Sequence, residues 1–453
     1  MERRLFGTSG IRGIVNKDIT PSLAVEVGAA LATRIGKGFI AVGRDPRLTG
    51  EMLEKALASG IVSCGVDVKL LGIIPTPVLA FVTRDLGAGA GVSISASHNP
   101  PEYNGLKVFD ASSMAYTEQM ERRIEQLIIQ RSFKFVPWDQ IGSVESVDVI
   151  DRYIDSILDG LEFGRDWRVA LDLFNGATCT VAPRVYERLG FKTIILNGQP
   201  DGHFSSGRPE PRGDTLKRLG EVVRHSGAEI GFGYDGDGDR MVAVDEKGDV
   251  PNLDQVLSAY AAHLVKKKGG GVVVTHMEAS MCIDDAVEKA GGKVVRTKVG
   301  DVAIAEAMAE HGALFGGEPI GAWIHPRYHL CPDGILSSLL LLKALEEEKK
   351  TLREFVEKMP MYHTIRTNIS CPEEKKKKIM NETSKRLVEQ FPETEQVLHV
   401  DGVRLQLGYG WILVRASGTE PLIRITVEAK NKAKAEEIMH KGEDYVKKLL
   451  EAM

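Results

Sequence analysis

The sequence lacks the features of a secreted or membrane-bound protein. Its five cysteines are scattered and contain no C-x-x-C pair, which argues against a disulfide framework or a thiolate zinc site. Its most apolar stretch, near residues 335–345, is far shorter than a bilayer span. The first ten residues are too polar for a signal peptide. We therefore expect a cytoplasmic protein that binds no membrane.

The chain also lacks an excess of basic residues and a nucleotide-binding P-loop. The 58 Lys and Arg residues are outnumbered by 63 Asp and Glu residues, giving a net charge of −5. No basic surplus is present to release counterions from a nucleic acid, so we expect no nucleic-acid partner. The absence of G-x-x-x-x-G-K-[ST] argues against an ATP-driven kinase.

What is present is a repeated order of strands and helices in a chain too long for one core. At 453 residues the length suggests three or four domains. Apolar patterns predict the order β-α-β-α-β three times, which is typical of parallel sheets with helical crossovers. The expected strands lie at residues 39–43, 66–71 and 91–96, then at 167–172, 191–196 and 228–233, then at 271–275, 293–297 and 313–315.

The pattern changes at about residue 362, where short strands with tight turns begin. Strands are expected at residues 364–369, 403–407, 411–415 and 423–429, followed by a helix from residue 432. This spacing predicts an antiparallel sheet backed by helices. The predicted fold class is three α/β domains with mixed sheets plus a C-terminal α+β domain. The expected boundaries are 1–148, 149–249, 250–361 and 362–453.

A serine loop ends the third predicted strand. Ser97-His98-Asn99 is followed by Pro100 and Pro101, and two prolines cannot continue a strand ladder. Ligands of open parallel sheets bind beyond the carboxyl ends of the strands. The Ser97 hydroxyl, the His98 imidazole and Lys107 are therefore candidate catalytic groups.

The most specific motif is Asp235-Gly-Asp237-Gly-Asp239-Arg240. In an extended segment the three carboxylates point to one side, and their repulsion favours a bound cation. Oxygen ligands suit Mg²⁺ or Ca²⁺. An EF-hand is disfavoured because Arg240 replaces the turn glycine, and a dinucleotide site because aspartates repel a pyrophosphate.

Two further loops offer groups for binding an anionic substrate. The stretch Arg415-Ala-Ser417-Gly418-Thr419 follows a predicted strand, and Arg424 lies in the next. A guanidinium, two hydroxyls and a glycine-opened backbone suit a phosphate. Glu318 lies in a glycine-rich loop, and Lys298 and Asp301 lie in the preceding loop. Together these groups fit phosphoryl transfer, where catalysis is mostly positioning and charge neutralisation.

These four loops, in this order, resemble those of the α-D-phosphohexomutase family over essentially the whole chain. The loops at Ser97, at Asp235–Arg240, at Gly317–Gly321 and at Arg415–Pro421 are similar to that family's phosphoserine, metal, sugar and phosphate loops. The resemblance implies four domains around a central cleft. It also implies a mutase that isomerises hexose phosphates through a 1,6-bisphosphate.

The resemblance implies a role for each candidate residue. Ser97 would carry the phosphoryl group, and Mg²⁺ would be held by the three aspartates and a phosphate oxygen on Ser97. Lys107 and His98 would assist proton transfer and charge balance, with Arg12 as a further catalytic residue. Substrate binding would fall to a larger set. This set comprises Arg240, Lys298, Asp301, Glu318, Arg415, Ser417, Gly418, Thr419 and Arg424.

Substrate preference depends on details of two segments. The opening segment 7–13 and the segment 296–301 are most similar to phosphoglucosamine mutases of archaeal type. We therefore expect a mutase of glucosamine phosphates. Ile320 and Ala322 stand where the family usually has serine and histidine, so mannose and glucose phosphates are alternative substrates. A sugar-phosphate phosphatase and a non-catalytic sensor are more distant alternatives.

Overall fold

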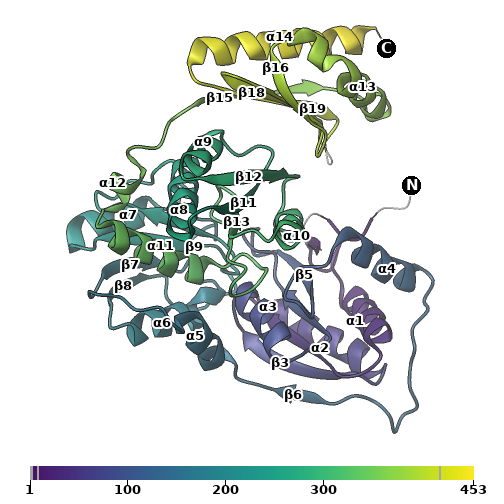
Figure 1. The fold of residues 1–453 in the computed structure, drawn as a ribbon. Helices are drawn as coiled ribbons and strands as arrows, with labels where there is room; N and C mark the ends of the chain where they lie inside the picture. Colours follow the sequence, from purple (N-terminus) through teal and green to yellow (C-terminus); the bar gives the residue numbers. More distant parts are fainter. Residues whose placement is uncertain (1–3, 8–9, 418–419, 453) are drawn as a thin grey trace. The chain divides into compact units, whose positions relative to one another are not determined.

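The structure is a computed structural model that describes residues 4–7, 10–417 and 420–452. Figure 1 shows the helices and strands, coloured by their place in the sequence. The chain divides into two compact units. The first comprises Met1–Leu253, Gly300–Glu306 and Phe315–Glu357, and the second comprises Asp254–Val299, Ala307–Leu314 and Lys358–Met453. Of the described helices, none combines the length and hydropathy needed to span a bilayer.

The first sheet has six strands in the order β1-β5-β4-β2-β3-β6. Strands β4, β2, β3 and β6 are parallel, and β1 and β5 add an antiparallel edge. The strands are β1 (Ile11–Ile14), β2 (Phe39–Arg44), β3 (Asp67–Ile73), β4 (Ala90–Ile94), β5 (Tyr103–Asp110) and β6 (Val144–Ser146). The helices are α1 (Pro21–Ile35), α2 (Gly50–Val62), α3 (Thr76–Asp85) and α4 (Glu118–Ile129). The mixed α/β character of this region is confirmed.

Two helices of the first sheet illustrate how the sequence sets the packing. Helix α1 begins with Pro21 after Thr20, whose side chain accepts a hydrogen bond from the Leu23 backbone N–H. A Cβ at Gly28 would lie 2.3 Å from the Leu57 carbonyl oxygen of α2. A side chain at this position would therefore push the two helix backbones apart.

The second sheet repeats the scheme with four strands in the order β10-β9-β7-β8. Strands β8, β7 and β9 are parallel and β10 is antiparallel to β9. The strands are β7 (Arg168–Asp172), β8 (Lys192–Leu196), β9 (Ile230–Tyr234) and β10 (Met241–Val244). The helices are α5 (Ile150–Leu158), α6 (Ala182–Arg188) and α7 (Lys217–Ser226).

The third α/β region is shared by the two units. The second unit contains the parallel pair β11 (Gly271–His276) and β12 (Gly292–Thr297) with helices α8 (Leu253–Lys268) and α9 (Cys282–Lys289). The first unit contains the antiparallel pair β13 (Phe315–Gly317) and β14 (Trp323–Ile324). The remaining helices of this region are α10 (Asp301–His311), α11 (Gly334–Glu348) and α12 (Leu352–Val356).

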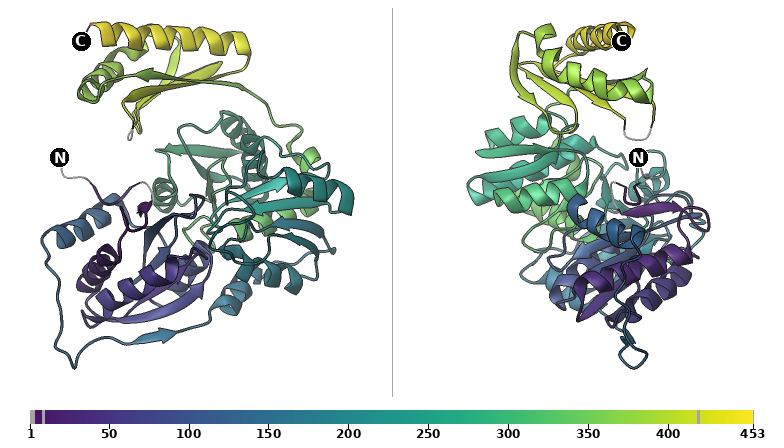
Figure 2. Two further views of the ribbon diagram at one scale, coloured as in Figure 1. Left: turned by 180° about the vertical axis from the view of Figure 1, so that it is seen from behind. Right: turned by 90° about the vertical axis from the view of Figure 1, so that its right-hand side faces the viewer.

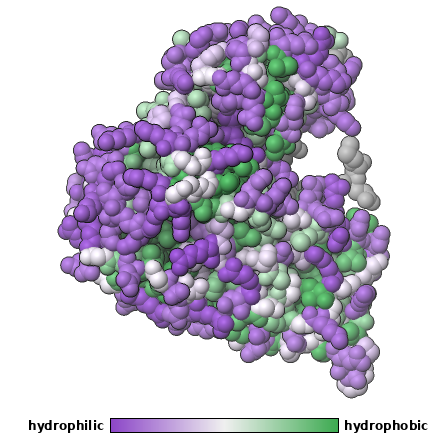
Figure 3. Space-filling model, in the orientation of Figure 1, coloured by the Kyte–Doolittle hydropathy of each residue, from purple (hydrophilic) through white to green (hydrophobic). Residues whose placement is uncertain are grey.

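The C-terminal sheet is antiparallel throughout, as the sequence predicts, in the order β15-β19-β18-β17-β16. Its strands are β15 (His363–Ser370), β16 (Thr394–Leu398), β17 (Val403–Leu407), β18 (Gly410–Ala416) and β19 (Leu422–Ala429). Helices α13 (Glu373–Arg386) and α14 (Lys432–Glu451) cover one face of it (Figure 2). The molecular face seen in Figure 3 is mainly hydrophilic, which leaves the apolar side chains largely to the sheet cores.

Candidate active site

The Ser97 side chain lies just beyond the carboxyl end of β4 and against the acidic loop. Its Oγ donates to Asp235 Oδ2 at 2.5 Å and lies 3.2 Å from His98 Nδ1. Ser97 is buried and has a φ of 52°, in the left-handed region that non-glycine residues seldom adopt. The fold therefore brings together two loops that are 138 residues apart in the sequence.

The acidic loop joins β9 to β10 and holds three carboxylates close together. The side chains of Asp235, Asp237 and Asp239 are buried, and one ligand oxygen from each lies within 4.8 Å of the others. A Cβ at Gly236 would lie 2.5 Å from the Ser97 carbonyl oxygen. The glycine at this position therefore permits the close approach of the acidic and serine loops.

Lys107, on β5, places an ammonium group between two of these carboxylates. Its Nζ lies 2.6 Å from Asp237 Oδ2 and 2.7 Å from Asp239 Oδ2. Burial opposes the charge on Lys107, but the two carboxylates outweigh burial and raise its pKa above the usual range. Burial likewise opposes ionisation of Asp237, but Lys107 and the Thr76 hydroxyl hold its pKa below the usual range. Lys107 therefore acts as a fixed positive charge in this arrangement.

The three aspartates have the chemistry of a divalent-cation site. Among the described residues, no group donates a hydrogen bond to the buried Oδ1 atoms of Asp237 and Asp239. Burial, with the charges of Asp239 and Asp237, raises the pKa of Asp235 well above its usual range. The Oδ1 atoms of Asp237 and Asp239 therefore lack donors in the described part of the chain, and Asp235 resists ionisation. Both observations show that the three carboxylates have too little positive charge around them. The donor set suits a hard cation.

Four more predicted site residues lie in the same unit. Arg12, on β1, pairs with Gly105 of β5, and its charge acts on both His98 and Lys107. Arg240 Nε lies 3.8 Å from Asp239 Oδ1. Burial raises the pKa of Asp301, and the neighbouring charges on it include Lys107 and Arg240.

Glu318 lies in the turn between β13 and β14. Its Oε1 accepts a hydrogen bond of 3.2 Å from the Gly300 backbone N–H. Burial, followed by the charge of Asp301, raises its pKa to about 7. The turn is attached to the second sheet because the Met241 N–H donates to the Gly321 carbonyl oxygen at 3.1 Å. Glu318 therefore lies in the same electrostatic environment as Arg240 and Asp239, which both act on its pKa.

The surroundings of His98 favour its neutral form. Burial, together with the positive charges of Arg240 and Arg12, lowers its pKa to about 4. The neutral imidazole can exchange a hydrogen bond with the Ser97 hydroxyl at 3.2 Å. For His98 to balance phosphate charge, as the sequence predicts, a phosphate on Ser97 would have to raise this pKa.

The remaining predicted binding residues belong to the second unit. Arg415 and Arg424 are direct partners on β18 and β19. Arg415 pairs with Glu278 at 2.8 Å and with Asp401 at 3.4 Å, while Arg424 pairs with Glu420 at 2.8 Å. Ser417 is buried and Lys298 is exposed, whereas Gly418 and Thr419 lie outside the described residues.

The sequence analysis did not identify the side chains that form hydrogen bonds to the acidic loop and to the serine loop. The Thr76 hydroxyl donates to Asp237 Oδ2 at 2.7 Å. Ser95 donates to Asp45 at 2.6 Å, and Arg47 donates to the Ser97 carbonyl oxygen at 2.9 Å. Asp45 and Arg47 follow β2, and Thr76 follows β3. The rule that ligands bind at the carboxyl ends of strands could have identified both turns.

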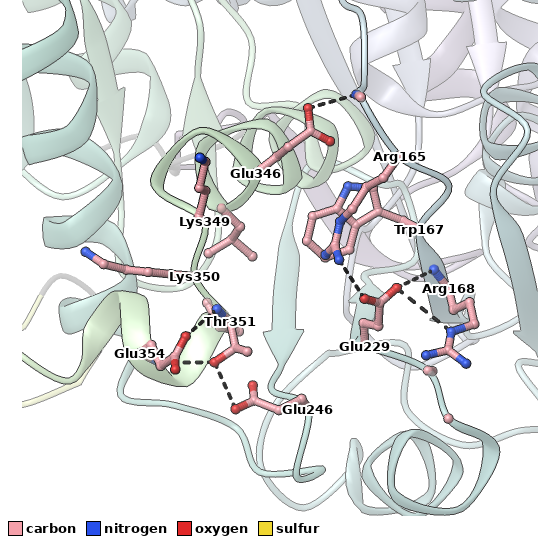
Figure 4. A pocket seen from close by; sticks show the side chains of 15 residues that line it. Arg165, Trp167, Arg168, Glu229, Glu246, Glu346, Lys349, Lys350, Thr351 and Glu354 are labelled. Atoms are coloured by element: carbon pink, nitrogen blue, oxygen red, sulfur yellow. Dashed lines mark hydrogen bonds and ion pairs between the residues drawn. The ribbon is translucent and has the colours of Figure 1, made fainter.

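A cavity of about 630 Å³ elsewhere in the first unit contains none of these groups (Figure 4). It lies between the edge of the second sheet and the segment joining α11 to α12. Two of its arginines, Arg165 and Arg168, pair with Glu229. Arg165 stacks on Trp167 at 3.7 Å and pairs with Glu229 at 2.9 Å. This cavity is therefore distinct from the candidate active site.

A serine hydroxyl against a buried acidic triad, carried on repeated α/β sheets, defines an enzyme of the phosphoryl-transfer class. Four family profiles match the chain. They are described as phosphoglucomutase/phosphomannomutase α/β/α domains I, II and III and C-terminal domain, and they match residues 3–135, 151–248, 252–362 and 367–443. The chain belongs to the phosphoglucomutase/phosphomannomutase family.

Two archaeal relatives match almost the whole chain. A protein of Methanothermobacter thermautotrophicus named "Probable phosphoglucosamine mutase" is 44% identical, over 99% of this chain and 98% of its own length. A phosphoglucosamine mutase of Methanocaldococcus jannaschii is 42% identical, over 99% of this chain and 100% of its own. A family crystal structure from Burkholderia thailandensis matches with a TM-score of 0.88 and 26% identity, covering 98% of this chain and 97% of that one.

Proposed function

We propose that the protein interconverts glucosamine 6-phosphate and glucosamine 1-phosphate through a phosphorylated Ser97 and a 1,6-bisphosphate. The observation that carries the proposal is the 2.5 Å contact between Ser97 Oγ and Asp235 inside the buried acidic triad. A phosphate on Ser97 would stand beside a cation held by the triad. The names of the two archaeal relatives support the choice of glucosamine.

We further propose that the cation is Mg²⁺, held by Asp235, Asp237, Asp239 and a phosphate oxygen on Ser97. Bound there, Mg²⁺ neutralises charge on the phosphoryl oxygens. Lys107 contributes a second, permanent positive charge, since it is buried and bonded to Asp237 and Asp239. Both charges stabilise a transition state whose negative charge spreads over the phosphoryl oxygens.

In the forward half-reaction the bond between Ser97 Oγ and phosphorus breaks while a sugar hydroxyl oxygen bonds to phosphorus. The hydroxyl proton leaves the sugar, and Ser97 Oγ gains one when it becomes a free hydroxyl. His98, 3.2 Å from Ser97 Oγ, is placed to relay a proton at that atom. The 1,6-bisphosphate then reorients and returns its other phosphate to Ser97, so that the enzyme is restored.

The second phosphate of the substrate would be held by Arg415, Ser417, Gly418, Thr419 and Arg424. The support is electrostatic: two arginines directly opposite on neighbouring strands repel each other unless anions lie beside them. Arg415 is paired with Glu278 and Arg424 with Glu420, so the substrate phosphate would replace these carboxylates or share the arginines with them. Lys298, Asp301, Arg240 and Glu318 would contact the sugar phosphate, with Arg12 beside the transferring group.

The sugar loop favours a second candidate, a mutase of mannose or glucose phosphates. Ile320 has an exposed fraction of 40% and presents an apolar surface where the family usually has a hydroxyl. Comparing kcat/KM for the 6-phosphates of glucosamine, mannose and glucose distinguishes the two candidates. A higher kcat/KM for mannose 6-phosphate than for glucosamine 6-phosphate would replace our first choice.

We also propose the four domains as residues 1–148, 149–249, 250–361 and 362–453. The ranges matched by the four family profiles support this division. All five cysteines are free thiols, which supports a reducing compartment such as the cytoplasm.

The test of the mutase proposal is Ser97→Ala, assayed after priming with glucose 1,6-bisphosphate. We expect loss of isomerisation and loss of the phosphorylated mass in intact-mass analysis. Ser112→Ala is the matched control, since Ser112 is an exposed serine bonded to Asp110 at 2.6 Å. Full isomerase activity in Ser97→Ala would refute the proposal. Release of inorganic phosphate without isomer would indicate a phosphatase, and an unphosphorylated, inactive wild type would indicate a sensor.

A further inference from the structure

Beneath the serine loop lies a buried ion pair that the proposed mechanism does not use. Arg47 and Asp45 follow β2 and have exposed fractions of 1% and 0%. Arg47 Nε lies 2.9 Å from Asp45 Oδ2, and the Arg47 backbone N–H donates to Asp45 Oδ1 at 3.1 Å. Each partner thus fixes the other's orientation, and the guanidinium is presented to the serine loop.

The guanidinium of Arg47 donates hydrogen bonds to several backbone carbonyl oxygens of the serine loop. It donates to the carbonyl oxygens of Ser97 at 2.9 Å, Asn99 at 2.7 Å and Tyr103 at 3.0 Å, and also to that of Pro100. These acceptors span the loop from the end of β4 to the start of β5. One side chain therefore fixes the path of the whole loop.

A short relay extends this control to the backbone of Ser97 itself. Ser95 Oγ donates to Asp45 Oδ2 at 2.6 Å and accepts from the Ser97 N–H at 2.8 Å. The carbonyl oxygen and the N–H of Ser97 are thus both anchored to the Asp45–Arg47 pair. Ser97 has a left-handed φ of 52°, and such a conformation persists only where its surroundings enforce it.

The same contacts also have an electrostatic consequence for a phosphorylated serine. Carbonyl oxygens carry partial negative charge, and those of a loop around a phosphate dianion would repel it. A guanidinium that binds four of them offsets this charge. Lysine could not replace it, because an ammonium is a point charge without the planar fork that serves several acceptors.

We propose that Arg47, oriented by Asp45, is a positioning residue that sets the Ser97 loop for phosphoryl transfer. This inference rests on the proposed role of Ser97 as the phosphoryl carrier. Arg47 contacts neither the sugar nor the transferred group, and it acts through the loop. Its loss should therefore lower kcat and leave sugar affinity nearly unchanged.

The chain offers a closely matched control in Arg296. Its guanidinium also gathers carbonyl oxygens, those of His276 and Ala279 at 2.9 Å and of Ser280 at 3.2 Å, and pairs with Asp284 at 2.5 Å. Arg296 is buried in the second unit, beside a loop without the phosphoryl serine. Arg296→Lys thus imposes the same chemical change without touching the Ser97 loop.

The experiment compares Arg47→Lys and Arg296→Lys in the full-length chain after priming with glucose 1,6-bisphosphate. Measured quantities are Tm, kcat and KM for glucosamine 6-phosphate, and the phosphorylated fraction by intact mass. For Arg47→Lys we expect kcat to fall by about 10²-fold and KM to change by less than about threefold, with a lower phosphorylated fraction. Arg296→Lys should lower Tm comparably yet retain the wild-type phosphorylated fraction.

Two results would overturn the inference. One is a kcat of Arg47→Lys within about threefold of the wild type. The other is a loss of the phosphorylated fraction in Arg296→Lys equal to that in Arg47→Lys. If Arg47→Lys does not fold, Ser95→Ala tests the inference instead, because it removes only the hydrogen-bond relay to Ser97. We expect Ser95→Ala to lower kcat about tenfold. An unchanged kcat in this variant would overturn the inference. An active Ser97→Ala would instead refute the proposed function.

Discussion

Replacing Lys107 by methionine tests whether the acidic cluster depends on its internal cation. The side chain keeps a similar length and loses the charge. Lys107 Nζ lies 2.6 Å from Asp237 and 2.7 Å from Asp239, and the exposed fractions of the three side chains are 5%, 1% and 11%. The substitution therefore leaves two buried carboxylates without the ammonium group that balances them.

The magnitude follows from the burial of the pair. Removing one partner of a buried ion pair costs about 3–5 kcal/mol, because the remaining charge is left desolvated. For a unit of about 300 residues each kcal/mol lowers Tm by about 1.5 °C, so we expect a decrease of roughly 4–8 °C in EDTA. Mg²⁺ should recover part of the loss, since a ligand at about 100 times its Kd stabilises by about 2.7 kcal/mol.

The assay is thermal unfolding of Lys107→Met and wild type, each in EDTA and in excess Mg²⁺. Lys55→Met is the control, because Lys55 lies at the same 2.6 Å from Glu51 but is 72% exposed. Exposed pairs contribute little, so its Tm should match the wild type. A Tm of Lys107→Met equal to the wild type in EDTA would refute the reasoning. So would a Mg²⁺ response no larger than that of the wild type.

Two further predictions concern substrate binding. Burial, followed by the charge of Asp301, raises the pKa of Glu318 to about 7. If the ionised Glu318 carboxylate accepts hydrogen bonds from sugar hydroxyl groups, 1/KM should rise between about pH 6 and 8 as this carboxylate forms. Glu318→Gln should abolish the rise. The same raised pKa makes Glu318 contribute stability at low pH that is lost as pH rises through about 7. Arg415→Lys should raise KM about tenfold or more with a smaller change in kcat, because lysine lacks the fork that grips a phosphate. An unchanged KM, measured with glucosamine 6-phosphate, would exclude Arg415 from the clamp.

The sequence was sufficient for the buried parallel strands and for the loops that follow them, but not for the short, exposed parallel strand β6. A continuous apolar run such as that of β2 predicts a buried strand, because both faces of such a strand are covered and its side chains are hydrophobic throughout. The antiparallel strand β5 was missed for a physical reason. Its sequence, YNGLKVFD, contains Asn104 and Lys107, which are buried because they bond to partners from distant segments. Polar residues in a buried strand interrupt the run of apolar residues from which a strand is predicted.

The supporting groups were missed because their role is defined only in three dimensions. The motif Asp235-Gly-Asp237-Gly-Asp239 predicts a cation site from the sequence alone, because its three carboxylates are only two residues apart and must lie close together. Arg47 has no such signature, because its acceptors lie 50 to 56 residues away. A charged residue in a turn is usually exposed. Only the folded chain reveals that this guanidinium is buried beneath the serine loop.

The charges of the described site in the first unit determine how a bound cation and a phosphate would each change it. The carboxylates of the described site outnumber its cations, and burial and mutual repulsion raise the pKa of Asp235 and of Glu318. A divalent cation held by the aspartates would correct this deficit, and a phosphate on Ser97 would restore it. A substrate that brings a second phosphate therefore requires an additional cationic group. In the clamp that we propose, Arg415 and Arg424 would supply this group by exchanging their present carboxylate partners for the second phosphate.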